Sequence, residues 1–464
     1  MFDPKTYGDR RARLRQQVGS GLILLLGNEP SPMNYTDNAY HFRQDDSFLY
    51  FFGLDTAGVS GVIDIEGGKD ILFGDDIDIE DIIWTGRMPT MKEQAARGGV
   101  SETAPLAKLE ETIKEARSQG RTVHFLPPYR AENKIKLQKW LAVDPAEAKA
   151  KASVPLIKAV IAQRLVKSAA EVREVEKALD VSADMYRLAM KSVKPGLTEQ
   201  EVMGRMSGLA LSRANGIAFP IILTINGQTL HNHGYGNVLK AGRLLVIDSG
   251  AESPLHYASD ITRTIPVSGK FSPKQKDIYE IVLEAHDLAI SLIKPGVLYR
   301  DIHLQAAGVI ASGLKDLGLM KGDTAQAVQV GAHAMFFPHG LGHQLGLGVH
   351  DMEDLGENSV GYDETITRSR QFGLAYLRFA KALEPGHILT VEPGLYFIPD
   401  LIDRWKAENK FAPFINYDQV EKFRGFGGLR LEDNVLVTPK GHRLLGRPIP
   451  IKAKDIERIM AGRG

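Results

Sequence analysis

The sequence predicts two domains, a smaller α/β domain followed by a larger domain built from two similar halves. The first observation is length, because 464 residues exceed what one hydrophobic core usually serves. The second is an internal repeat, in which Ser192-Val-Lys-Pro-Gly-Leu returns one hundred residues later as Leu292-Ile-Lys-Pro-Gly-Val. The third is that the part of the chain before this repeat alternates short helices and strands.

The first elements of the amino-terminal part are predicted from their apolar patterns. Residues 5–18 indicate a basic amphipathic helix, and Leu22–Leu26 indicates a buried strand. Val59–Ile65 and Asp70–Phe73 indicate paired strands joined by a Gly-Gly turn. The aromatic-rich stretch His41–Gly53 is predicted to form a strand and a turn.

Further along, residues 105–119 and 130–142 are predicted helices, with a strand at Thr122–Leu126 between them. We assign residues 1–160 to this domain and residues 161–464 to the next. The first domain holds no dense cluster of metal-ligand side chains. This favours a scaffold or an oligomerisation role for it.

The second domain begins with well-marked helices. Predicted amphipathic helices at Ala178–Lys191 and Ile278–Leu292 each precede one copy of the repeat. Capping boxes mark three helix starts, namely Ser168 with Glu171, Thr198 with Glu201, and Ser272-Pro273 with Gln275. Two similar halves of helices followed by a strand predict a pseudo-two-fold domain with a site where the halves meet.

The composition excludes several classes of function. The formal net charge is zero, so no basic surplus indicates nucleic acid or an acidic membrane as a partner. The absence of cysteine excludes disulfides, thiolate nucleophiles and Cys-ligated zinc. The most apolar early run, Leu22–Leu26, is too short to span a bilayer, and the start lacks a secretory apolar core. We therefore expect a cytoplasmic location.

Three of the 13 histidines fall in the glycine-rich stretch Phe336–Asp351, at His339, His343 and His350. His339 and His343 are four residues apart, a metal-binding spacing on a helix, but Pro338 and the glycines argue against a helix there. No Glu follows His339, which excludes the helical zinc-protease motif. A glycine-rich loop lets the backbone pass close to a ligand or a metal. The alternative is an ordinary loop.

Acidic residues end several predicted strands of this domain. Asp248 ends an apolar strand, and Asp260 follows twelve residues later on the predicted return strand. Such a hairpin can place both carboxylates on one face, where they repel unless they share protons or cations. Glu392 ends another apolar strand, and Glu432 lies two residues after Arg430 on a strand predicted from Gly428. Each acid alone could equally be a solvated strand end or part of a buried ion pair.

The charges indicate a dinuclear metal site. Two divalent cations balance the four carboxylates of Asp248, Asp260, Glu392 and Glu432, and metal binding lowers the pKa of water from 15.7 towards ~7. Four carboxylates and the imidazole of His343 make a hard ligand set. Manganese, cobalt or iron(II) fit it better than a thiolate-type zinc site does.

These motifs resemble those of the pita-bread metallopeptidases, the family of creatinase, aminopeptidase P and prolidase. The motifs are Asp248-Ser-Gly, Ser259-Asp-Ile-Thr-Arg-Thr, His339-Gly-Leu-Gly-His, Val349-His-Asp, Thr390-Val-Glu-Pro-Gly and Leu429-Arg-Leu-Glu-Asp. His41-Phe-Arg-Gln-Asp and Trp84-Thr-Gly-Arg resemble the amino-terminal domain of the proline-specific branch. The resemblance implies an α+β protein, with a pita-bread catalytic domain at 161–464 behind a smaller creatinase-like α/β domain at 1–160.

The resemblance also implies roles for individual residues. Two divalent metal ions, manganese first with cobalt, iron or zinc as alternatives, would be held by Asp248, Asp260, His343, Glu392 and Glu432. Catalytic roles fall to Glu392 as acid and base and to His231, His339 and His350 near the scissile amide, with His233 as an alternative to His231. Substrate binding falls to Arg378, Arg430, His231 and His350, although Arg430 could equally be a structural partner for an acid.

The implied function is hydrolysis of Xaa-Pro peptide bonds. Arg378, fourteen residues before Glu392, matches an arginine that grips the substrate carboxylate in prolidase, so an Xaa-Pro dipeptidase is the first expectation. The alternatives are an Xaa-Pro aminopeptidase that accepts longer peptides and a non-catalytic binding protein on the same fold. The expected partners are a small peptide with proline at its second position and a second copy of the chain, with no nucleic acid and no membrane.

Overall fold

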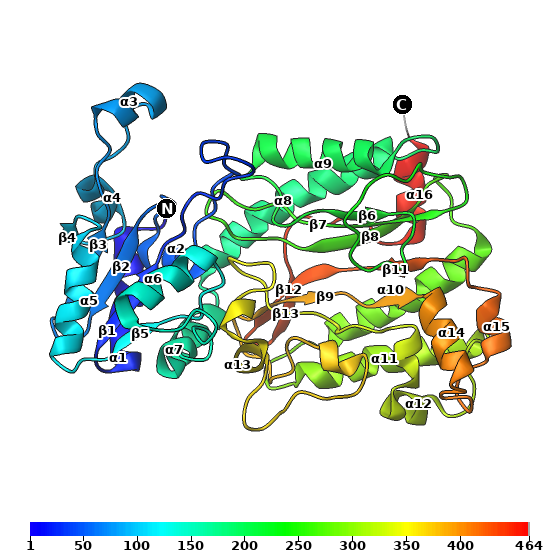
Figure 1. Cartoon of the computed structure of the whole chain (residues 1–464). Helices are drawn as coiled ribbons and strands as arrows, with labels where there is room; N and C mark the ends of the chain where they lie inside the picture. Colours follow the sequence, from blue (N-terminus) through cyan, green and yellow to red (C-terminus); the bar gives the residue numbers. More distant parts are fainter. Residues whose placement is uncertain (463–464) are drawn as a thin grey trace. The chain divides into compact units, whose positions relative to one another are not determined.

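The structure, a computed structural model, describes residues 1–462 and divides into two compact units (Figure 1). Unit 1 comprises Met1–Arg164 together with Met352–Ser359. Unit 2 comprises Leu165–Asp351 and the chain from Val360 onward. The chain therefore passes from one unit to the other after Arg164, after Asp351 and after Ser359.

Unit 1 contains a five-stranded sheet in the order β4-β3-β2-β1-β5. The strands are β1 (Leu22–Leu26), β2 (Ser60–Asp64), β3 (Lys69–Phe73), β4 (Glu102–Ala104) and β5 (Val123–Phe125). β1, β2 and β3 pair antiparallel in succession, whereas β4 and β5 join the two edges parallel. The strands predicted at 22–26, 59–65, 70–73 and 122–126 are confirmed.

The helices of this part of the chain are α1 (Pro4–Val18), α2 (Asp46–Phe52), α3 (Ile79–Thr85), α4 (Met91–Arg97), α5 (Lys108–Ser118), α6 (Ala131–Leu141) and α7 (Val154–Leu165). Two of the arginines of α1, Arg10 and Arg11, are buried and do not form a basic surface. Arg11 is fully buried and donates to the carbonyl oxygen of Phe51 at 2.6 Å and to Asp70 at 2.8 Å. These contacts fix α1 against the end of α2 and against β3.

The strand and turn predicted at His41–Gly53 are wrong, because α2 occupies most of that stretch. Asp45 caps the helix by accepting the N–H of Phe48 at 2.9 Å, and Gly53 ends it with a φ of 71°. The side chains around the helix from Ser47 to Phe52 are buried. A short helix buried on all sides shows no helical periodicity in its sequence, so it cannot be told from a buried strand.

Unit 2 has two halves, each of which begins with two helices and continues to strands (Figure 1). The first half contains α8 (Ala169–Ser192), α9 (Glu199–Arg213), β6 (Ile222–Thr224), β7 (Leu244–Ser249) and β8 (Ile261–Pro266). The second contains α10 (Pro273–Leu292), α11 (Tyr299–Asp316), β9 (Ile388–Val391), β10 (Gly394–Tyr396), β11 (Gly428–Arg430), β12 (Asp433–Thr438) and β13 (Gly441–Leu444). Figure 1 shows the strands between α8 and α9 on one side and α10 and α11 on the other.

Each half contributes one three-stranded sheet, in the orders β6-β7-β8 and β13-β12-β9, and β10 pairs with β11. The three predicted capping boxes are present at the starts of α8, α9 and α10. α8 and α10 both end where the two copies of the Lys-Pro-Gly repeat begin. The predicted pseudo-two-fold arrangement is confirmed.

The single strand predicted from Gly428 to Val437 is wrong, because it breaks at Glu432 into β11 and β12, which belong to different sheets. At the break, the N–H of Leu431 donates to the carbonyl oxygen of Pro393 at 3.2 Å. The N–H of Glu432 donates to the carbonyl oxygen of Thr262 at 3.0 Å, which forms an isolated bridge to β8. The chain changes partners at the position of the predicted carboxylate ligand.

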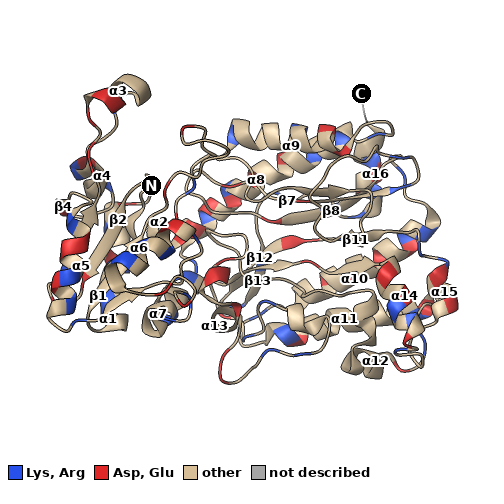
Figure 2. Ribbon diagram, viewed as in Figure 1, with Lys and Arg blue, Asp and Glu red and all other residues tan. Residues whose placement is uncertain are grey.

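The remaining elements are α12 (Thr324–Val330), α13 (Glu357–Gly361), α14 (Pro399–Ala407), α15 (Tyr417–Glu421), α16 (Ala453–Ala461) and the 3₁₀ helices η1 (Ala332–Met335), η2 (Glu353–Leu355) and η3 (Leu374–Tyr376). Charged residues of both signs are interspersed over the helices (Figure 2), in line with the zero net charge. Within residues 1–462, no helix combines the length and the apolarity that crossing a membrane requires.

Candidate active site

The β7–β8 hairpin brings Asp248 and Asp260 onto the same face. Asp248 pairs with Thr262 in the antiparallel register, and Asp260 stands two residues before Thr262. Alternation along a strand therefore directs the two carboxylates to one side as diagonal neighbours. The backbone N–H of Asp260 donates to Oδ1 of Asn434 at 3.1 Å, and the Asn434 amide donates back to the Asp260 carbonyl oxygen. Both aspartates are buried.

Glu392 and Glu432 come from the second half of unit 2. Glu392 follows β9, where its N–H donates to the carbonyl oxygen of Leu341 at 2.8 Å. The hydroxyl of Thr390 donates to Oε1 of Glu392 at 3.2 Å. Glu432 lies in the break between β11 and β12 and is 1% exposed. Acids from both halves therefore face the place where the halves meet.

His343 lies between these two sets of acids. Its Nδ1 is 3.0 Å from the carbonyl oxygen of Gln344, which directs Nε2 towards the carboxylates. Nε2 lies 3.4 Å from Oδ2 of Asp260 and 3.6 Å from Oε1 of Glu392. The loop approaches β9 closely, because a Cβ added at Gly342 would lie 2.1 Å from the carbonyl oxygen of Thr390. The irregular, glycine-rich conformation predicted for this stretch is present.

Within residues 1–462, one group of three side chains has ligand atoms close enough to hold a metal ion. Asp260, His343 and Glu432 each offer one such atom, and these atoms lie within 4.8 Å of one another. Asp248 and Glu392 are outside this group by the same criterion. They adjoin it, since Asp248 is the diagonal neighbour of Asp260 and Glu392 lies beside His343.

The carboxylates perturb one another strongly. Burial, followed by the charge of Asp248, raises the pKa of Asp260 well above its ordinary value. Burial, followed by the charge of Asp260, raises the pKa of Glu432 in the same direction. Burial also raises the pKa of Glu392 to about 7, against the opposing charges of His343 and Arg430. The site thus holds more negative charge than its own cations neutralise.

Unpaired oxygens show that the donor set fits a hard divalent cation. Oδ1 of Asp248, Oδ1 of Asp260 and Oε1 of Glu432 are buried without a hydrogen-bond partner. Unpaired buried polar atoms are costly in a folded protein, and carboxylate oxygens with imidazole nitrogen are ligands that manganese, iron or zinc accept. Burial lowers the pKa of His343, which favours the neutral imidazole that a metal requires.

Arg430 reaches into the site from β11. One of its Nη atoms donates to Oδ2 of Asp248, the other to the hydroxyl of Tyr396 at 2.8 Å, and Nε to the hydroxyl of Thr262 at 3.2 Å. Arg430 is 3% exposed, so this is a buried ion pair. The structure therefore makes Arg430 a partner of a predicted ligand as well as a neighbour of the site.

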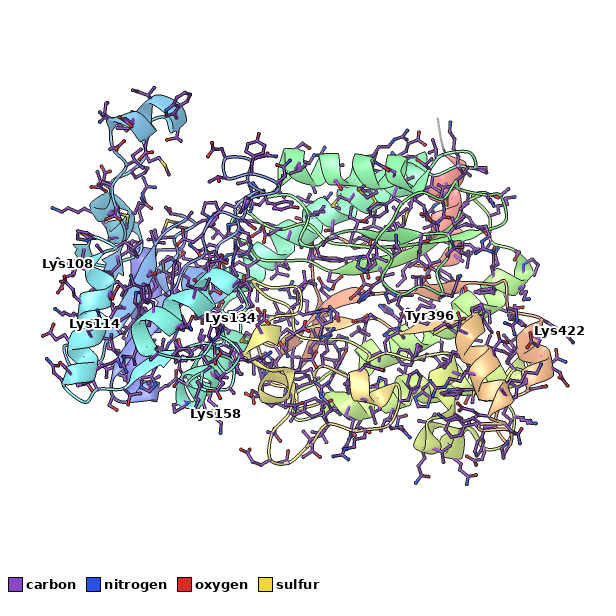
Figure 3. The ribbon with its side chains drawn as sticks, viewed as in Figure 1. Lys108, Lys114, Lys134, Lys158, Tyr396 and Lys422 are labelled. Atoms are coloured by element: carbon purple, nitrogen blue, oxygen red, sulfur yellow. The ribbon has the colours of Figure 1, made fainter. Side chains whose placement is uncertain are left out.

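His339 is linked to Arg430 through Tyr396, which is labelled in Figure 3 on β10. Nδ1 of His339 lies 2.8 Å from the carbonyl oxygen of Gly340, and Nε2 lies 3.0 Å from the hydroxyl of Tyr396. Burial lowers the pKa of His339 to about 3, so the ring is neutral. With its proton on Nδ1, the ring accepts the Tyr396 O–H at Nε2, while Tyr396 accepts from Arg430.

His350, His231 and Arg378 lie around the same site. The rings of His350 and His343 meet edge to face with centroids 4.4 Å apart. Burial, followed by the charge of Arg430, lowers the pKa of His231, and His350 and Arg378 add smaller effects. Arg378 also contributes to the lowered pKa of His343. The charge of Arg378 therefore reaches both His231 and His343.

Sequence reasoning missed Tyr396, Thr262, Thr390 and Asn434, which orient the predicted site residues. A signal was available for two of them, because side chains two residues apart on a strand share a face. Thr262 stands two residues after Asp260, and Thr390 stands two residues before Glu392. No comparable signal identifies Tyr396.

Comparison with known families matches both parts of the chain. Residues 173–439 match metallopeptidase family M24, and residues 7–124 match the aminopeptidase P, N-terminal domain family. The first match covers more than half of the chain.

Similar proteins include both proline-specific types. The chain is 31% identical to the human Xaa-Pro dipeptidase over 455 residues, covering 96% of this chain and 90% of the relative. It is 33% identical to a probable Xaa-Pro aminopeptidase of Metarhizium robertsii over 446 residues, covering 95% and 92%. Among solved structures, aminopeptidase PepP of Pseudomonas aeruginosa superposes with a TM-score of 0.81 at 29% identity, covering 100% and 99% of the two chains. Aminopeptidase P of Escherichia coli with the inhibitor Pro-Leu gives 0.82 at 27%, with the same coverage.

Proposed function

Since the chain belongs to metallopeptidase family M24 and is a proline-specific peptidase, we propose that it is an Xaa-Pro dipeptidase that works with two divalent metal ions. The observation that carries this proposal is the buried group of Asp260, His343 and Glu432, with Asp248 and Glu392 beside it. A carboxylate-rich set of this kind needs cations to neutralise it. Manganese is the first candidate for a hard oxygen-rich set.

The five predicted ligands would hold the metal ions, which supply Lewis-acid polarisation of a carbonyl and a lowered pKa for water when bound. The chain's own residues supply the proton transfers. Glu392 lies beside His343 and would be the group that takes a proton from water and returns it. The proline nitrogen is the leaving group of the reaction and needs such a proton, because it departs as a neutral secondary amine.

The histidines and Tyr396 position the substrate in this proposal. Neutral His339 is held at Nε2 by Tyr396, and Tyr396 is held by Arg430. His350 lies beside His343 and would face the scissile carbonyl in this proposal. Donors fixed before the reaction stabilise a developing oxyanion without reorganisation. His231 would hold the peptide from the outer part of the site, since part of the residue reaches solvent.

The choice of a dipeptidase depends on Arg378. Its charge lowers the pKa of both His231 and His343, which supports a guanidinium near the site, and a guanidinium suits a carboxylate. A carboxylate directly on the proline residue is present only in a dipeptide. The second candidate is an Xaa-Pro aminopeptidase, which is favoured by the similarity to solved aminopeptidase P structures over the whole chain.

The test is a length series of Xaa-Pro, Xaa-Pro-Yaa and longer peptides, with metal content measured on the same preparation. An Xaa-Pro dipeptidase should cleave the first substrate most efficiently and should lose activity when chelation removes its metal. A preference for tripeptides and longer peptides would instead support the aminopeptidase. A protein that binds no divalent metal and turns over none of these substrates would contradict both.

The assignment of residues 1–160 and 161–464 to two domains, the cytoplasmic location and the homodimer remain predictions. The helix α3 supports the homodimer as part of this proposal. Ile79, Ile83 and Trp84 of α3 are 69%, 73% and 86% exposed, and the helix has no buried residue. Several large apolar side chains exposed together on one short helix are a feature of protein–protein interfaces.

A further inference from the structure

A buried ion pair joins Lys167 to Asp351, the residue directly after His350. Nζ of Lys167 lies 3.0 Å from Oδ2 of Asp351, and the two side chains are 2% and 1% exposed. Neither residue has a role in the mechanism proposed above. Burying both charges costs free energy that a hydrophobic pair would not, so stability alone is a poor explanation for the pair.

Asp351 closes the loop that carries the histidines. Its Oδ1 accepts the N–H of Gly348 at 3.2 Å, and its own backbone N–H donates to the carbonyl oxygen of Gln344 at 3.1 Å. The same Gln344 oxygen lies 3.0 Å from Nδ1 of His343. One residue therefore ties both ends of the segment 344–351 together.

Glycine at position 346 leaves room for the ion pair. A Cβ there would lie 2.4 Å from Oδ2 of Asp351 and 3.0 Å from Cε of Lys167. The carbonyl oxygen of Gly346 accepts the N–H of Ala258 at 2.8 Å, which joins the loop to the chain just before Asp260. The loop is thus fixed by the ion pair and by the hairpin that carries the aspartates.

The backbone of Lys167 is itself anchored. Its N–H donates to the carbonyl oxygen of Gly386 at 2.9 Å, and the next residue, Ser168, caps α8. Arg164 is the last residue of unit 1 before Lys167, and Asp351 is the last residue of unit 2 before the chain returns to unit 1. Lys167 and Asp351 both belong to unit 2, and each lies close to a point where the chain passes between the units. The ion pair links these two points of the chain.

We propose that Lys167 is a positioning residue that, through Asp351, fixes His350 beside His343 and so sets kcat for Xaa-Pro hydrolysis. The inference rests on the proposed function, in which His350 faces the scissile amide. The edge-to-face contact of the two rings, with centroids 4.4 Å apart, makes the place of His350 depend on the loop that Asp351 closes. A displacement of about 1 Å at such a site can cost about 100-fold in rate.

The test is a double-mutant cycle between Lys167→Met and His350→Ala, with kcat and KM measured on an Xaa-Pro dipeptide. Methionine keeps the apolar stem of lysine and removes the charge. We expect Lys167→Met to lower kcat by about 10- to 100-fold and to leave KM within about threefold, and Lys167→Arg to restore most of kcat. In the His350→Ala background, Lys167→Met should cause no further loss, because it acts through His350.

Asp351→Asn removes the other partner of the ion pair. If Lys167→Met does not fold, Asp351→Asn replaces it in the double-mutant cycle with His350→Ala. The amide keeps an oxygen for the N–H of Gly348 but lacks the charge that holds Lys167, so the same loss of kcat is expected. The proposal would be overturned if the ion-pair variant lowered kcat by the same factor in the His350→Ala background as in the wild type, because the ion pair would then not act through His350. An unchanged kcat in folded Lys167→Met would overturn it as well.

Hydrogen exchange of the amides in segment 344–351 gives a readout that does not depend on activity. Lys167→Met should speed exchange in this segment, whereas Lys167→Arg should not. The matched control is Lys276→Met, which removes a lysine paired to Glu457 at 3.0 Å elsewhere in unit 2 and should leave the segment unchanged. If the wild type cleaves no Xaa-Pro substrate, the proposed function fails. Faster exchange in Lys167→Met then still supports the loop's dependence on Lys167, and unchanged exchange overturns it.

Discussion

The hydroxyl of Thr262 donates a hydrogen bond of 2.7 Å to Oε2 of Glu432, between residues 170 positions apart in the chain. Thr262 also stands opposite Asp248 in the β7–β8 register, and its hydroxyl oxygen accepts the Nε–H of Arg430 at 3.2 Å. The other oxygen of Glu432 is buried without a partner. One threonine therefore orients a carboxylate so that its second oxygen remains available for a metal ion.

Thr262→Val should weaken metal binding, because it removes this hydrogen bond while keeping the shape of the side chain. Partners that orient metal ligands are worth about 10- to 100-fold in affinity, so a loss of that size is expected. Competition with a chelator of known affinity measures it. The matched control is Thr224→Val, at a buried threonine of β6 whose hydroxyl accepts the N–H of Asn226 instead. Equal affinities in wild type and Thr262→Val would remove Thr262 from the site.

Asp248→Asn should abolish turnover and leave the fold intact. An amide offers one neutral oxygen where the site needs a negative charge, and it also loses the ion pair to Arg430. Activity should fall by more than about tenfold, which corresponds to one pKa unit of free energy. The measurements are turnover, metal content and the far-UV spectrum. More than about a tenth of the activity with both metal ions still bound would contradict the five-ligand assignment.

The clustering of the predicted acids could be foreseen because polar residues at the ends of apolar strands are conspicuous in a sequence. Asp248 and Glu392 each end such a strand, and the structure places both next to His343 or its neighbours. The same reasoning was wrong about the strand through Glu432. Its break depends on Thr262 and Pro393, which are distant in sequence and supply the backbone partners of residues 431 and 432.

Two other features, the helix α2 and the role of Tyr396, could not be predicted from local sequence patterns for similar reasons. The helix α2 was predicted as a strand because it is buried on all sides, and only Asp45 and Gly53 mark its ends. Tyr396 gave no signal, because its role depends on reaching both His339 and Arg430. Contacts of that kind are set by tertiary packing and not by local spacing.

The stability of the metal-free protein should respond to pH through Glu392. Burial raises its pKa from an ordinary 4.5 to about 7, so between these values the folded state keeps a proton that the unfolded state has lost. A raised carboxylate pKa makes stability fall as pH rises through this window. Relative to wild type, metal-free Glu392→Gln should therefore gain Tm between pH 5 and pH 8. Parallel Tm curves for the two proteins would show that Glu392 has no raised pKa.

Activity should rise with pH in the metal-loaded enzyme, because metal binding requires unprotonated carboxylates and a neutral His343. The rate should be measured between roughly pH 5 and 8, the range in which imidazole titrates, at saturating manganese. A flat profile across this range would argue against the ligand set.

Trp84→Ala should weaken the predicted homodimer. Trp84 is 86% exposed on α3, and large aromatic side chains often supply much of the binding energy of an interface. Sedimentation at micromolar concentration compares the variant with the wild type. Leu211→Ala is the control, since Leu211 is 71% exposed on α9 and has no assigned role in association. A wild type that sediments as a monomer would count against the dimer altogether.

Arg378→Ala should separate the two candidate functions. If the guanidinium holds the free carboxylate of the proline residue, the preferred substrate ends at proline. Loss of a charge-assisted, bidentate contact should cost roughly 2–3 kcal/mol, or about 30- to 150-fold in kcat/KM on Xaa-Pro. Cleavage of Xaa-Pro-Yaa should change much less, because a third residue moves the carboxylate away from Arg378.

The control for this comparison is Arg370→Ala, which removes an exposed arginine from the same segment of the chain. It should leave kcat/KM on both substrates unchanged. Equal losses on Xaa-Pro and Xaa-Pro-Yaa in Arg378→Ala would reduce Arg378 to a structural residue. A wild type that prefers the longer peptide would assign the chain to the aminopeptidases, since a binding site for a free proline carboxylate would then offer no advantage to the substrate that is used.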